Sequence, residues 1–85
     1  MATIDRVIRG IPAWLMGEYL QEMGGLRQGD GRYTHPQWSA TVKQIEDYQI
    51  GSLVVGQIQF HLQADDAIIE PFQKQLDRKL LRGGG

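Results

Sequence analysis

The segment from Ile50 to Gln63 constrains the fold more than any other, because its residue types alternate along the chain. From Val54 onward, apolar or small residues occupy one parity and polar residues occupy the other. The apolar parity holds Val54, Gly56, Ile58, Phe60 and Leu62, and the polar parity holds Gln57, Gln59, His61 and Gln63. A period of two is typical of a strand with one face on a core and one face in water. We therefore expect this segment to be the central strand of a sheet, bent near Gly56 because its full length exceeds the width of a small domain.

The composition limits the class of protein. The chain has 85 residues and no Cys, so we expect one small domain, over residues 1–82, without disulfides, thiolate metal sites or thiol nucleophiles. Residues 83–85 are predicted to be a flexible glycine tail. Nine basic and ten acidic side chains give a net charge of −1, which argues against binding to nucleic acid or to a membrane surface. Without an apolar leader or span, we expect a cytoplasmic, bacterial protein.

Two segments at the start of the chain carry secondary-structure signals, of which the first is ambiguous and the second is clearer. Residues 3–11 are short and rich in β-branched residues, which favours a strand, although their apolar spacing also fits a helix. Residues 12–23 have the apolar spacing of a helix, which starts at Pro12 and ends at the Gly24-Gly25 pair. Gly17 lies inside this helix, where it costs about 1 kcal/mol against Ala unless its lack of a side chain permits close packing on the sheet.

Residues 24–37 are rich in glycine and have no apolar period, so they are predicted to be a long loop. A second strand begins at Trp38, and the parity break at Ile45 indicates a bulge or a strand end near Gln44. A turn over residues 47–51 leads into the central strand. Residues 65–82 are predicted to form a helix, despite Pro71 inside it.

The order strand, helix, strand, strand, helix defines an α+β domain. We expect a three-stranded sheet in the order 1-3-2, with both helices on one face, because the hairpin places the last two strands side by side. This element order resembles a ferredoxin-like domain that stops before its last strand. The first strand would then be an exposed, β-branched edge, and such an edge invites pairing with another chain. We therefore predict a homodimer, joined along this edge or through the open sheet face.

The predicted loop brings together two cations, an imidazole and two aromatic rings, those of Tyr33 and Trp38. Its candidate ligand-binding residues are Arg27, Arg32, His35 and Trp38. Arginines on a glycine-rich loop could hold a phosphate or a carboxylate by bidentate hydrogen bonds. No phosphate-loop or dinucleotide motif is present. The alternative is a solvated, hairpin-like segment with Trp38, and Tyr33 beside it, packed in the core or at its rim.

The polar side of the central strand is a candidate interaction face. Its residues are Gln57, Gln59, His61 and Gln63. The sequence has two histidines, His35 and His61, which are far apart and have no Cys to complete a metal site. No nucleophile-elbow pattern accompanies Ser39 or Ser52, so we name no catalytic residue, no metal and no cofactor.

The last residues of the chain, 80–85 (LLRGGG), are similar to the Leu-Arg-Gly-Gly ending of ubiquitin. Gly-Gly endings also mark the sulfur-carrier proteins of that fold. The resemblance implies a carrier whose bare diglycine end enters the narrow channel of an activating enzyme and reaches its adenylate. In that family a hairpin comes first and the tail follows a strand, whereas here the tail follows a predicted helix and has one further glycine. The alternative interpretation is a helix that ends at Gly83.

The sequence therefore supports three functional hypotheses. The first is a small protein-interaction or self-association module without catalytic chemistry. The second is a module that binds a small anionic ligand through residues 24–38, and the third is a carrier with a Gly-Gly tail. An enzyme ranks below these three, because no nucleophile–base pair or metal set can be named.

Overall fold

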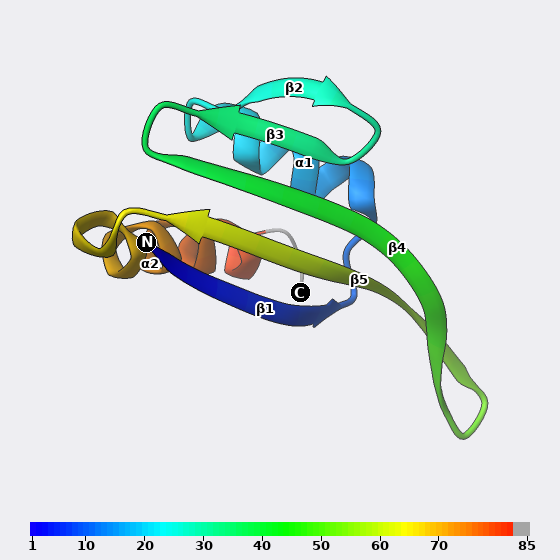
Figure 1. The fold of residues 1–85 in the computed structure, drawn as a ribbon. Coiled ribbons are helices and arrows are strands. Elements are labelled where there is room, and N and C mark those ends of the chain that lie inside the picture. Colours follow the sequence, from blue (N-terminus) through cyan, green and yellow to red (C-terminus); the bar gives the residue numbers. More distant parts are fainter. Residues whose placement is uncertain (83–85) are drawn as a thin grey trace.

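The computed structural model describes residues 1–82, so the predicted flexible tail over residues 83–85 lies outside the described residues. Two helices and one antiparallel sheet form an α+β domain, as expected (Figure 1). The elements in chain order are β1 (Ala2–Arg9), α1 (Ala13–Glu22), β2 (Leu26–Gly29), β3 (Arg32–His35), β4 (Trp38–Ile50), β5 (Leu53–Ala64) and α2 (Asp66–Arg82). The strand predicted over residues 3–11 and both predicted helices are confirmed. Pro12 is the N-cap of α1 rather than its first helical residue.

The sheet has five strands in the order β1-β5-β4-β3-β2, and every neighbouring pair is antiparallel. The 50–63 segment was predicted to be the central strand. β5 does lie between the first strand and β4, as predicted, but the middle strand of the five is β4. The predicted three-stranded sheet is wrong, since β3 and β2 continue the sheet beyond β4. Four strands follow one another between the two helices, so the comparison with a truncated ferredoxin-like domain is also wrong.

The two additional strands lie in the segment that the sequence predicted to be a loop. β2 has no buried residue and Tyr33 is the one buried residue of β3, so neither strand shows an alternating apolar pattern. The turn between them depends on Gly31, which has a φ of 73°. The Gly31 carbonyl accepts a hydrogen bond of 2.7 Å from the Val42 amide. A side chain at Gly31 would overlap the Val42 carbonyl, so the turn requires glycine.

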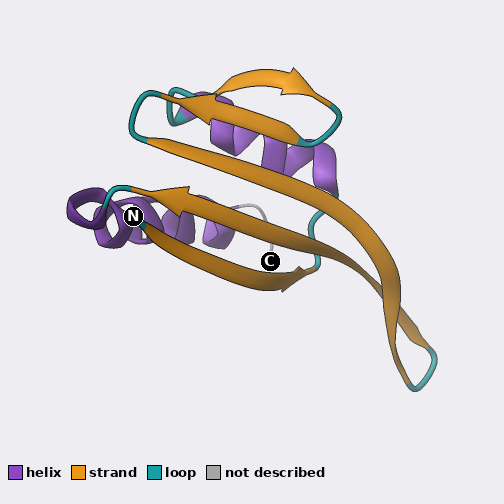
Figure 2. Cartoon of the chain, viewed as in Figure 1, coloured by secondary structure: helices purple, strands orange, loops and turns teal. Residues whose placement is uncertain are grey.

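Both helices lie on the same face of the sheet, behind the strands in Figure 2. The core between these layers contains Phe60, Ile58 and Leu62 from β5, with Leu20 from α1 and Leu76 from α2, and each is at most 1% exposed. Complete burial of such side chains contributes about 1.5–3 kcal/mol each. The apolar parity predicted for β5 therefore faces the helices, and the opposite sheet face has no helix on it.

Polar contacts fix α2 against the rest of the domain. The Arg6 guanidinium on β1 donates a hydrogen bond of 3.0 Å to the Asp77 carboxylate. The Lys79 ammonium donates one of 2.6 Å to the Glu22 carboxylate at the end of α1. These ion pairs join α2 to both the first strand and the first helix.

The hairpin of β4 and β5 extends well beyond the other strands (Figure 1). β1 pairs with β5 only as far as Gln57, and β3 pairs with β4 only as far as Thr41. Residues 46–56, which we call the arm, therefore have no neighbouring strand outside the hairpin itself. The arm contributes to the elongated shape of the molecule, which measures 42 × 25 × 20 Å.

Candidate functional site

The sheet face that carries no helix is the first candidate surface, and we call it the open face. The strand registers place the polar parity of β5 there together with alternate residues of its neighbours. The predicted interaction residues Gln57, Gln59, His61 and Gln63 all lie on this face. From the neighbouring strands it also includes Asp5, Arg32, Ser39, Thr41 and Lys43. Over the body of the domain the open face is mostly polar, with the exposed Val7 opposite Gln59 and Ile45 opposite Gln57 as its apolar members.

One row of side chains crosses four strands of the open face. Asp5 on β1 is opposite His61 on β5. On its other side, His61 is opposite Thr41 on β4, and Thr41 is opposite Arg32 on β3. Residues directly opposite each other in antiparallel strands have Cβ atoms about 5 Å apart, so neighbours along this row can share a ligand. Asp5 Oδ1 lies 2.7 Å from His61 Nδ1. A carboxylate accepts the Nδ1 proton, so this contact sets the orientation of the imidazole and leaves Nε2 for another partner.

A shallow hollow of about 180 Å³ lies beside this row. The polar side chains that line it are those of Arg32, Thr34, Ser39, Thr41, His61 and Gln63. Arg32 supplies N–H donors, the hydroxyls and the Gln63 amide can also donate, and the imidazole can do so when protonated. The hollow is therefore rich in hydrogen-bond donors.

The four residues predicted to bind a ligand do not come together in one site. Trp38 is 5% exposed and belongs to the core, where it stacks on His35 with ring centroids 5.4 Å apart and packs edge-on against Phe72. Arg27 lies on the outer strand β2, with its guanidinium 4.0 Å from the Asp30 carboxylate. Arg32 alone reaches the hollow on the open face.

The hollow thus combines Arg32 from one predicted site with His61 and Gln63 from the other. The cross-strand row beside the hollow also includes Asp5 and Thr41, which the sequence did not single out. Asp5 is 56 positions from His61 in the sequence, so only the pairing of β1 with β5 reveals their contact.

The arm provides the second candidate surface, and a β-bulge creates it. The register of β4 against β5 shifts by one residue between Ile45 and Tyr48, close to the bulge predicted near Gln44. A shift of one residue moves the following side chains to the other face. Beyond the bulge, the registers place Tyr48, Ile50, Leu53 and Val55 on one face of the arm, which continues the open face. We call these four residues the apolar arm face.

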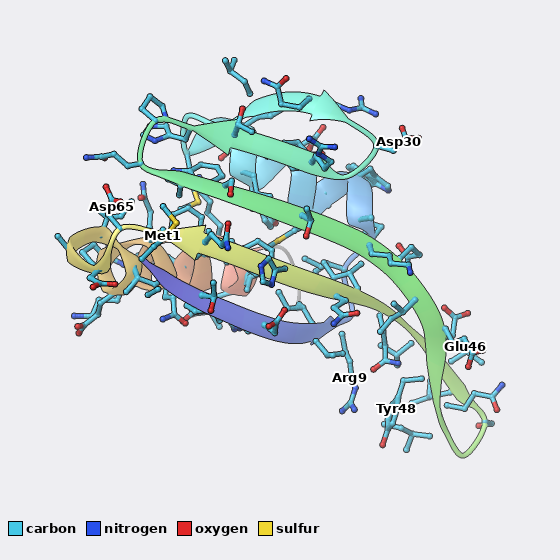
Figure 3. All side chains as sticks on the ribbon, in the orientation of Figure 1. Met1, Arg9, Asp30, Glu46, Tyr48 and Asp65 are labelled. Carbon is cyan, nitrogen blue, oxygen red and sulfur yellow. The ribbon has the colours of Figure 1, made fainter. Side chains whose placement is uncertain are left out.

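Several contacts hold the base of the arm in place. The Arg9 guanidinium lies 3.8 Å from the centre of the Tyr48 ring, and Figure 3 labels both residues at this end of the molecule. Arg9 Nε also donates to Gln57 Oε1 at 2.9 Å, and Gln57 Nε2 donates to the Glu46 carbonyl at 2.9 Å. Gln44 Nε2 donates to the Gln57 carbonyl at 2.9 Å. These contacts link the base of the arm to β1 and to the adjoining part of the sheet.

Farther out, the apolar arm face is open to solvent. Ile50 and Leu53, which face each other beside the tight turn at Gly51, are 55% and 66% exposed. Val54 is 57% exposed, but it points to the opposite face of the arm. Adjacent exposed apolar residues on a protruding hairpin are typical of an interaction surface.

Two negative findings apply to the described part of the chain. Within residues 1–82, no group of three or more His, Cys, Asp or Glu side chains is placed to hold a metal ion. No described helix has the length and apolar character needed to cross a membrane.

The fold and these surfaces define a small α+β domain with one sheet face covered by helices and the other open. The chain belongs to the family described as archaeal MoaD-like protein, whose model matches residues 4–85. The family description is archaeal, so it gives no support to the predicted bacterial origin. A comparison with curated proteins found no match.

Proposed function

We propose that this protein is a self-association module that forms a homodimer through the apolar arm face. The observation that carries the proposal is the exposure of Ile50 and Leu53, which are 55% and 66% exposed on a hairpin outside the main sheet. A two-stranded hairpin is marginally stable in water on its own, so the arm gains from a surface that covers it. Burial of its apolar area would stabilise the arm by about 25 cal/mol per Å².

A second copy of the chain suits the arm because the arm has unpaired strand edges. Neither β1 nor β3 pairs with residues 46–56, and of the backbone groups there the Gly56 carbonyl accepts a hydrogen bond of 2.9 Å from the Gly10 amide, outside the hairpin. The edges of residues 46–55 have no strand to pair with outside the hairpin. Two copies related by a twofold axis bring the same edge of each arm together in antiparallel orientation. The product is a four-stranded ribbon in which the apolar residues of the two arms form one continuous face, and neighbours across the new strand pair partly cover one another.

The charge change Ile50→Lys tests the dimer. We expect it to weaken self-association at least tenfold, because it places an unpaired cation in the apolar interface. Val54→Lys is the matched control, since Val54 is β-branched and equally exposed but lies on the opposite face of the arm. Sedimentation equilibrium over a range of concentrations measures both dissociation constants.

Three outcomes of this experiment would count against the arm. A wild-type chain that stays monomeric at high concentration contradicts the homodimer. A dimer that persists unchanged in Ile50→Lys favours the free edge of β1, the other interface that the sequence predicted. If Val54→Lys weakens the dimer as much as Ile50→Lys does, the interface is not confined to the apolar arm face.

A second candidate function is that of a carrier protein, favoured by the family match together with the sequence LRGGG at residues 81–85. In a sulfur carrier, the terminal glycine carboxylate attacks the α-phosphorus of ATP and releases pyrophosphate. Hydrosulfide then attacks the carbonyl carbon of the acyl adenylate, and AMP leaves, which gives a thiocarboxylate. In this chain the glycines follow helix α2, which extends to Arg82, whereas the tail of ubiquitin follows a strand.

Mass spectrometry of the protein isolated from its natural host tests the carrier function. A carrier is expected to show a fraction of the chain with sulfur in place of one oxygen at a C-terminal glycine, or joined to another molecule there. Only unmodified termini, in cells grown with and without added sulfur source, would count against it. The arm variants do not touch the tail, so the two candidate functions can fail separately.

A further inference from the structure

The hollow on the open face has the chemistry of an anion site. Arg32 lines it, and among the described residues no side chain forms a hydrogen bond or an ion pair with its guanidinium. Arg27, the other arginine of the same hairpin, lies instead beside the Asp30 carboxylate. An arginine without an anionic partner, next to several other donors, can bind an oxyanion through two parallel hydrogen bonds.

The remaining groups of the hollow supply donors from the opposite side. Thr41 lies between Arg32 and His61 in the cross-strand row, and its hydroxyl can donate to a ligand bound there. Asp5, the one carboxylate of this row, is engaged by His61 Nδ1 at 2.7 Å. His61 lines the hollow and Asp5 does not, and the contact with Asp5 leaves the other imidazole nitrogen for a ligand.

We propose that this hollow binds an oxyanion, either a phosphate or a carboxylate group, on the helix-free face of the sheet. Arg32 provides the bidentate contact and the main charge. Thr41 and Gln63 donate additional hydrogen bonds, and His61, held by Asp5, donates when it is protonated. With a volume of about 180 Å³, the hollow admits one such group and leaves the rest of the ligand on the open sheet face. The site is separate from the apolar arm face and does not depend on the homodimer.

Titration of the ¹⁵N-labelled protein with inorganic phosphate, and separately with acetate, tests the site. We expect saturable shifts of the backbone amides in residues 32–34, 39–41 and 61–63. The variant Arg32→Gln is expected to weaken binding at least tenfold, and Thr41→Val, which keeps the shape of the side chain, is expected to weaken it severalfold. Arg27→Gln is the matched control and should leave the affinity unchanged.

The outcomes distinguish the ligand classes and the proposals. Saturation by phosphate alone identifies a phosphate site, and saturation by both anions identifies a general oxyanion site. Linear shifts that do not saturate, or the same loss of affinity in Arg27→Gln and Arg32→Gln, would overturn the proposal. Binding should be unchanged in Ile50→Lys, so failure of the dimer leaves the anion site intact.

Discussion

Replacement of Trp38 by Ala is expected to lower the free energy of unfolding by about 3–5 kcal/mol, the largest effect that we predict for a single substitution. Trp38 is 5% exposed and is packed between the His35 ring, stacked at 5.4 Å, and the Phe72 ring, at 4.9 Å. Its removal leaves a cavity where α2, β3 and β4 meet. The loss is a large fraction of the stability of a domain of this size, which is about 4–13 kcal/mol.

The chain provides a matched control, because its other tryptophan lies on the surface. Trp14 on α1 is 67% exposed, so Trp14→Ala should change the free energy of unfolding by no more than about 0.5 kcal/mol. Urea denaturation followed by circular dichroism measures both variants independently of tryptophan fluorescence. Similar losses in the two variants would contradict the packing of Trp38.

The sequence predicted those elements whose own residues show an apolar pattern with the period of a strand or of a helix. The alternation from Val54 to Leu62 is long enough to identify an interior strand, and both helices have clear apolar stripes. β2 and β3 could not be predicted in this way, because their positions depend on pairing with β4 and on the turn at Gly31. A strand with no buried residue, such as β2, has no apolar pattern to read.

The candidate sites were harder to predict because strand registers determine them. Arg32 and His61 were each recognised as chemically promising, but only the pairing of β3, β4 and β5 places them in one row. The apolar arm face has a similar origin. A parity break at Ile45 indicated a bulge, yet the side to which Tyr48 and Ile50 turn became evident only from their partners on β5.

A glycine inside a helix lowers its stability, and for Gly17 the sequence suggested close packing of the helix on the sheet as the reason. The structure confirms this close packing. A Cβ atom at Gly17 would overlap the Tyr33 hydroxyl and lie 2.9 Å from the ring carbon that bears it. Tyr33 is 7% exposed, so its ring has little room to move. The missing side chain of Gly17 is therefore what allows α1 to approach β3.

Gly17→Ala is expected to destabilise the domain by about 2 kcal/mol. Overpacking against the buried Tyr33 ring costs about 3 kcal/mol, and the better helix propensity of Ala offsets about 1 kcal/mol of that cost. Gly56→Ala is the control, because a Cβ atom there meets nothing closer than the Gln44 side-chain nitrogen at 3.8 Å. Thermal and urea unfolding of both variants measure the difference.

The second variant Tyr33→Phe identifies the contact itself. Because it removes the hydroxyl that the new Cβ atom would overlap, we expect Gly17→Ala to cost less in the Tyr33→Phe background than in the wild type. The remaining cost reflects the ring carbon at 2.9 Å, which the substitution does not remove. Equal costs in the two backgrounds would show that the Tyr33 hydroxyl does not limit the approach of α1 to the sheet.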